Sequence, residues 1–174
     1  MTNSSLPRPA ASEFEPYYQK YVALVPDGDL VSVLATQIDA TLTLLAGLDE
    51  TQANHRYAPD KWTVKQVIEH MIDVERVMAY RAFRFSRADA TDLPGFEEND
   101  YARAGRAAHL RLADLATAFA HMRTTTIDLF AAMDETMGAR GGTANGASVT
   151  ARALGYIIAG HERHHVGILK ERYL

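Results

Sequence analysis

Two histidines four positions apart, His161 and His165, lie in the last long stretch of the chain, residues 148–173. An α-helix turns about 100° per residue, so both imidazoles project from one face of a helix. The same face carries apolar side chains, namely Leu154, Ile157, Ile158, Ile168 and Leu169. A polar ring buried there without a partner costs about 1–3 kcal/mol. Each imidazole therefore needs a partner.

A divalent metal ion would satisfy both rings, because this spacing brings two ring nitrogens to one ion at about 2.0–2.1 Å. The alternative is a pair of core histidines, each hydrogen-bonded to a carboxylate or a carbonyl. His70 is the candidate third ligand, since it lies at the edge of the apolar stripe of another predicted helix. Three neutral imidazoles from facing helices leave at least one position open for a water or a substrate thiol. Taken alone, His70 has the commoner alternative of a hydrogen bond to a neighbouring group.

Residues 161–165 also match the pattern HExxH, in which Glu162 would be the general base of a metalloprotease. The longer metzincin pattern fails, because Ile168 and Glu171 stand where glycine and histidine are required. A zincin also needs a sheet edge for its substrate, and the sequence shows no strand. Peptide hydrolysis is the least favoured reading, and Glu162 is more simply a residue on the flank of the helix.

Glu75 is the other candidate catalytic carboxylate, because it lies within the apolar stripe of the helix that carries His70. It could accept a hydrogen bond from a ligand histidine or act as a general base. A structural ion pair with an arginine of another helix is the alternative. Three arginines on the same helix could bind an anionic thiol cofactor or form a solvated face: Arg81, Arg84 and Arg87.

Aromatic residues near the predicted helix ends could line a pocket mouth or belong to the core: Trp62, Phe96 and Tyr156. His164 projects about 60° away from the direction that His161 and His165 share. It is therefore a neighbour of the site rather than a ligand.

Composition limits the function classes. The chain has 174 residues, of which 47% are hydrophobic, and this suits one domain at residues 13–174 after a flexible polar tail at 1–12. With no cysteine, a metal must sit on nitrogen and oxygen ligands. The net charge of −4 comes from mixed charges, so nucleic acid is not an expected partner. No apolar run approaches a membrane span or a signal peptide, so we expect a cytoplasmic protein without membrane contact.

Helical periodicity dominates the rest of the chain. It predicts a short helix at residues 15–25 and long helices at 30–48, from 63 to about 85, at 112–134 and at 148–173. Thr63 starts one of them with a capping box, and Ser148 is the expected cap of the last. Residues 88–99 are expected to be an acidic loop or lid, and the glycine-rich residues 138–146 a flexible connection. The fold class is therefore all-α, a four-helix bundle.

Four segments together resemble the DinB/YfiT-like superfamily: Lys61-Trp62-Thr63, His70 with Asp73 and Glu75, residues 84–96, and residues 160–174. The resemblance covers nearly the whole chain. It implies an up-down-down-up four-helix bundle with a short extra N-terminal helix, usually dimeric, with a metal on three histidines. His70, His161 and His165 occupy the three histidine positions.

The resemblance also implies a range of activities. The family includes thiol-dependent transferases and isomerases that use bacillithiol, mycothiol or glutathione, beside members without an assigned reaction. Many relatives have Arg-Gly-Gln after the second C-terminal histidine, whereas here Val166-Gly167-Ile168 follows His165. The ligand set is intact, but substrate contacts inferred from those side chains do not carry over.

Two hypotheses follow. The first is a metal-dependent enzyme with zinc or nickel on His70, His161 and His165, which activates water or a low-molecular-weight thiol for attack on a small electrophile. The expected assembly is a homodimer. The second is a catalytically inactive bundle that binds a metal or another ligand.

Overall fold

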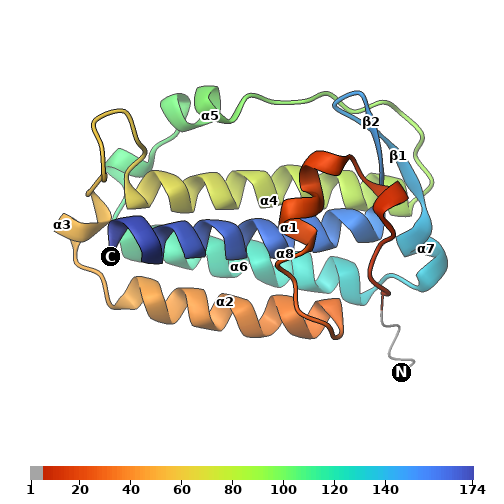
Figure 1. Ribbon diagram of the computed structural model, residues 1–174, viewed down its shortest axis with the longest axis horizontal. Coiled ribbons are helices and arrows are strands. Elements are labelled where there is room, and N and C mark those ends of the chain that lie inside the picture. Colours follow the sequence, from red (N-terminus) through yellow and green to blue (C-terminus); the bar gives the residue numbers. More distant parts are fainter. Residues whose placement is uncertain (1–5) are drawn as a thin grey trace.

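A computed structural model gives the fold of residues 6–174, and its framework is the predicted bundle of four long helices (Figure 1). The bundle helices are α2 (Leu30–Ala46), α4 (Val64–Ser86), α6 (Leu112–Ala131) and α8 (Ala151–Ile168), the last continuing as a π-helix over Leu169–Tyr173. The shorter elements are α1 (Gln19–Val22), α3 (Glu50–Ala53), α5 (Glu98–Ala104), α7 (Glu135–Ala139), β1 (Gly141–Ala144) and β2 (Ala147–Thr150). Within this part of the chain, no helix combines the length and apolar character needed to cross a membrane.

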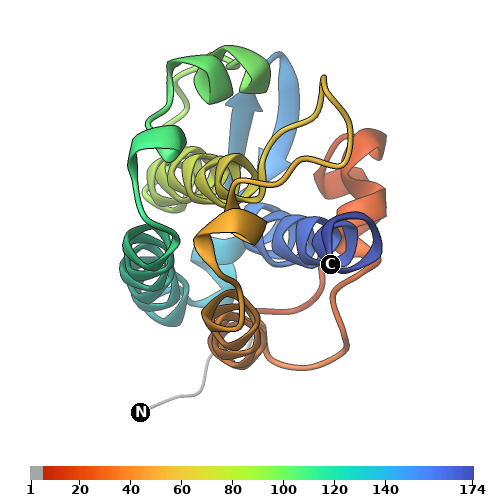
Figure 2. The ribbon, with the colours of Figure 1, turned by 90° about the vertical axis from the view of Figure 1, so that its left-hand side faces the viewer.

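The four helices follow the order α2, α6, α4, α8 around the bundle axis (Figure 2). α4 and α6 run in the same direction, whereas α2 and α8 run in the opposite one (Figure 1). Two consecutive parallel helices need a connection that returns along the bundle, and residues 87–111, with α5, supply it. The topology is therefore up-down-down-up, as the resemblance implied.

Side-chain caps fix where the bundle helices begin. Thr63 Oγ1 accepts from the Gln66 amide at 3.2 Å, while Gln66 Oε1 accepts from the Thr63 amide at 2.9 Å, which confirms the predicted capping box. Asp29 caps α2 by accepting from the Ser32 amide at 2.8 Å. The expected cap of α8 was wrong, because Thr150 rather than Ser148 accepts from the first turn of that helix.

The glycine-rich connection is an ordered β-hairpin, which corrects the prediction of a flexible segment without strands. β1 and β2 pair antiparallel from Gly141 opposite Thr150 to Ala144 opposite Ala147. The turn between them, Asn145-Gly146, has positive φ angles of 54° and 76°. An Asn-Gly pair favours this tight hairpin turn, so the signal was present in the sequence. Leu93 joins the hairpin through its amide, 2.9 Å from the Thr143 carbonyl oxygen, and thereby fixes the return connection.

The N-terminal residues are packed from Leu6 onward, although a flexible tail was expected over residues 1–12. The Leu6 side chain is buried in the core. Arg8 donates hydrogen bonds to the carbonyl oxygens of Val22 and Val25 at 2.9 and 2.7 Å. Residues 1–5, the start of the expected tail, lie outside the described residues.

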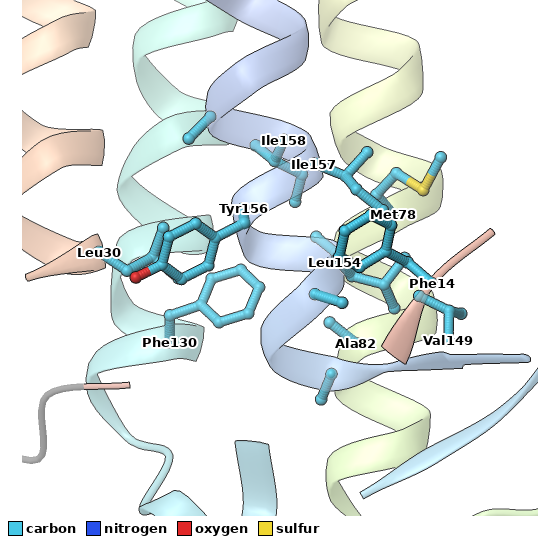
Figure 3. Packing of buried hydrophobic residues seen from close by; sticks show 14 of the residues in the cluster. Phe14, Leu30, Met78, Ala82, Phe130, Val149, Leu154, Tyr156, Ile157 and Ile158 are labelled. Carbon is cyan, nitrogen blue, oxygen red and sulfur yellow. The ribbon is translucent and has the colours of Figure 1, made fainter. Parts of the chain in front are cut away.

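The largest hydrophobic cluster surrounds the first half of α8 (Figure 3). Leu154 and Ile157 point toward Met78 of α4, while Phe130 of α6 closes the other side. Burying a side chain of this size contributes about 1.5–3 kcal/mol. This packing fixes the rotation of α8 about its axis, and the rotation decides where the histidines of its second half point.

Candidate metal centre

His70 of α4 and the α8 pair His161 and His165 converge inside the bundle. The Nε2 atom of His161 lies 3.1 Å from the Nε2 atom of His70 and 3.1 Å from that of His165. One ring nitrogen from each residue falls within a group whose members all lie within 4.8 Å of one another. The structure therefore brings together the three residues that the sequence nominated as ligands.

Burial holds the three imidazoles in the neutral form that a metal requires. It lowers the pKa of His70 from 6.5 to about 4 and that of His165 to about 3. The pKa of His161 is lowered well below 6.5, first by burial and then by the neighbouring His165 and His70. At neutral pH the three rings are therefore uncharged.

Hydrogen bonding among the rings cannot satisfy all three nitrogens. A neutral imidazole nitrogen carries either one proton or one lone pair. Nε2 of His161 can therefore make a hydrogen bond with only one of its two close neighbours. A divalent cation would accept the lone pairs of all three nitrogens at once, so the donor set fits a metal better than it fits a network of histidines.

Aromatic side chains flank the three histidines. The Trp62 ring lies 4.8 Å from the His70 ring, and the Tyr21 ring meets His161 edge-on at 5.4 Å. Tyr21 approaches α8 closely because Gly160 has no side chain, and a Cβ there would collide with the Tyr21 backbone. These contacts restrict the rotation of the imidazoles and shield one side of the site.

Glu98, at the start of α5, is the carboxylate beside the histidines. Its Oε2 atom lies 3.9 Å from Nε2 of His70, and its side chain is about half exposed, at 54%. The sequence indicated an acidic return segment but gave no register for it relative to α4. Glu98 lies beside His70 because the connection formed by residues 87–111 runs back along the bundle past α4.

A pocket of about 240 Å³ opens beside His161. It lies between α1, α4, α8 and the return connection, with Asn145 of the hairpin turn at its edge. The side chains that line it are Tyr17, Tyr18, Tyr21, Val74, Met78, Arg81, Phe96, Glu97, Glu98, Asn145, Ile157 and His161. Its volume suits a small molecule.

Glu75 and Glu162, the candidate catalytic carboxylates, both bind Arg123 of α6. Glu75 makes a two-pronged ion pair with Arg123 at 2.9 and 2.8 Å, and Glu162 lies 2.7 Å from the same guanidinium. Glu162 also accepts from Thr41 at 2.6 Å and from Gln37. All three charged side chains are buried, being 1–3% exposed. Of the alternatives for Glu75, the structure contains the ion pair, and Glu162 faces α2 rather than the exposed flank.

Some of the aromatic residues and arginines singled out in the sequence line the pocket, whereas others lie elsewhere. Phe96 lines the pocket, whereas Tyr156 belongs to the core and donates to the Leu6 carbonyl oxygen at 3.3 Å. The three arginines of α4 do not form one solvated face. Arg84 is bound to Asp89, Arg87 stacks on the Phe83 ring, and Arg81 is buried.

Known proteins share this architecture. The YfiT protein of Bacillus subtilis, described as a probable metal-dependent hydrolase with an unusual four-helix bundle topology, matches with a TM-score of 0.69. The match covers 95% of this chain and 91% of that one at 16% sequence identity, so it shows the fold. A search of curated proteins finds no match. The family model of the DinB superfamily matches residues 34–169, and the chain therefore belongs to the DinB superfamily.

Proposed function

We propose that the protein is a metal-dependent enzyme whose divalent ion is held by His70, His161 and His165. The observation that carries this proposal is the convergence of three neutral imidazole nitrogens beside a pocket, from the buried His70 and His161 and the partly buried His165. Imidazole nitrogens are ligands for both zinc and nickel, the two ions that we propose. The description of YfiT as a probable metal-dependent hydrolase supports the proposal of a metal-dependent enzyme.

A bound ion would act as a Lewis acid that lowers the pKa of a water or a low-molecular-weight thiol. The chain's own residues then have separate tasks. Trp62 and Tyr21 hold the imidazoles in place and limit access of bulk water. Glu98 is placed to accept the proton that the nucleophile loses beside His70.

Glu75 and Glu162 have no chemical step in this proposal. Their oxygens are bound to Arg123, and those of Glu162 also to Gln37 and Thr41. The base of an HExxH peptidase would have to be free to meet a water, so this arrangement counts against that alternative. We assign both carboxylates to holding α2, α4, α6 and α8 together.

Two reactions fit the site. With water as the nucleophile the enzyme is a hydrolase, and with a low-molecular-weight thiol it is an S-transferase that attacks a small electrophile. The pocket of about 240 Å³ supports a small-molecule substrate in either case. The homodimer and the cytoplasmic location stay predictions.

The metal is tested by elemental analysis of protein purified without a metal-affinity column. We expect about one zinc or nickel per chain in the wild type and in His164→Ala, and none in His161→Ala. His164 is a matched control, because it is on the same helix and also contacts the Tyr21 ring. Stoichiometric metal in His161→Ala would contradict the proposal.

Activity separates the enzyme from its rival, an inactive bundle that binds a metal or another ligand. The metal-loaded protein is assayed with thiols plus epoxide or halogenated electrophiles, and separately with ester and amide substrates. Turnover that is lost on metal removal and restored on reloading supports the enzyme. Metal that raises stability without turnover of any of these substrates supports the inactive bundle.

A further inference from the structure

Arg81 of α4 is a buried cation without an acidic partner. Its side chain is 4% exposed. Nη2 donates to the Pro94 carbonyl oxygen at 2.7 Å, and Nη1 contacts the Met78 sulfur at 3.7 Å. Within residues 6–174, no carboxylate forms an ion pair with this guanidinium. The other arginines with little exposure differ: Arg123 binds Glu75 and Glu162, and Arg152 binds Glu13.

An unpaired buried charge is unfavourable, and a folded chain normally pairs it. Burial lowers the pKa of Arg81, but a guanidinium in a protein keeps its proton. The cation therefore persists in the folded protein and is stabilised by any anion that can reach it. A neutral carbonyl and a thioether sulfur use only part of its capacity of five N–H donors.

Arg81 lines the same pocket as His161, so one small molecule can contact both. Apolar side chains also line this pocket, among them Val74, Met78 and Ile157. The Phe96 ring lies 6.0 Å from the Arg81 guanidinium. The pocket thus offers a cation for an anionic group, apolar surface for a small carbon skeleton, and His161 of the three histidines in its wall.

Building on the proposed function, we infer that the substrate is a small organic carboxylate whose carboxyl group binds Arg81 while its reactive group faces the three histidines. A guanidinium binds a carboxylate through two parallel hydrogen bonds. Glu97 and Glu98 line the same pocket and would repel a second negative charge, so a single carboxylate is favoured over a phosphate dianion. Charge, volume and lining together define this substrate class.

The test compares benzoate with the neutral benzamide, which has nearly the same shape. Binding is measured by calorimetry and by NMR titration. In the metal-free wild type we expect benzoate to bind at least about tenfold more tightly than benzamide, because a bidentate charged pair replaces a neutral contact. We expect Arg81→Met to lose this preference and Arg84→Met, on the next turn of α4, to retain it. Equal binding of both probes, or binding of neither, by the wild type overturns the inference.

Two further measurements keep the inference separate from the metal proposal. If benzoate binds only the metal-loaded protein, the carboxylate is bound by the ion rather than by Arg81, and the inference fails while the metal site stands. If no metal binds but the preference for benzoate depends on Arg81, the anion site stands and the metal proposal fails. If Arg81→Met does not fold, Arg81→Lys is used instead, because lysine keeps the positive charge but cannot form the two parallel hydrogen bonds of a guanidinium. Weakened benzoate binding by Arg81→Lys supports the inference, and unchanged binding contradicts it.

Discussion

The Nε2 atom of His70 lies 3.1 Å from the Nε2 atom of His161, although 91 positions separate the two residues in the sequence. α4 and α8 are neighbours that run in opposite directions, which brings the first turns of α4 beside the second half of α8 (Figure 1). Packing of α4 against α8 therefore brings the histidines together. Changes in protonation, in helix contacts or in buried charge should therefore affect both the stability of the fold and the metal site.

We expect the stability of the metal-free protein to fall as the pH drops below about 6.5. Burial lowers the pKa of His70 to about 4 and that of His165 to about 3, from 6.5. The unfolded chain therefore takes up protons first, and the stability that is complete above pH 6.5 is lost as the pH falls toward the folded values. Urea denaturation in the presence of a chelator at pH 7.5, 6 and 5 measures this. A smaller pH dependence in His165→Leu supports the assignment, and a flat wild-type profile contradicts it.

Arg123→Met should strongly destabilise the fold, because it leaves Glu75 and Glu162 buried without their cation. Removing one partner of a buried ion pair costs about 3–5 kcal/mol. The free energy of unfolding in urea gives the measurement. Arg111→Ala is the control, since Arg111 pairs with the exposed Asp114, and we expect no measurable change there. A loss below about 1 kcal/mol for Arg123→Met would argue against its role in holding the helices together.

Gly160→Ala should displace α1 from the metal centre. A methyl group there would collide with the Tyr21 backbone, and overpacking of this kind costs about 1–3 kcal/mol. Gly167→Ala, on the same helix, meets nothing within 4 Å and should stabilise the protein by about 0.5–1 kcal/mol through helix propensity. Thermal unfolding and metal content are measured for both variants. Equal unfolding temperatures and equal metal contents of the two variants would show that the close contact between Tyr21 and Gly160 does not contribute to the stability of the site.

Glu98→Gln should keep the metal and lose turnover. The amide cannot accept a proton as the carboxylate does, and general-base catalysis typically contributes about 10²–10⁴-fold. The assay uses whichever substrate class shows metal-dependent activity, with metal content determined on the same sample. Asp100→Asn, on the same short helix and paired with Arg103, is the matched control and should retain activity. Full activity in Glu98→Gln would remove Glu98 from the mechanism.

The sequence alone determined the elements that follow local rules. Helical periodicity predicted the four bundle helices, and the cap at Thr63 was predictable because a capping bond joins residues only three positions apart. The spacing of His161 and His165 fixed their common face for the same reason. The hairpin turn Asn145-Gly146 was equally local, and its signal was missed among the surrounding glycines.

Tertiary structure decided everything that depends on which faces meet. The sequence left open whether Glu75 pairs with an arginine, and Arg123 could not be chosen until α4, α6 and α8 were packed together. Arg81 and Arg84 lie close together on one helix, yet the return connection buries Arg81 against Pro94 and leaves Arg84 with Asp89. The same connection brings Glu98 to His70. Periodicity reports how a helix is oriented about its own axis, whereas the partner of each face depends on long-range packing that no local spacing encodes.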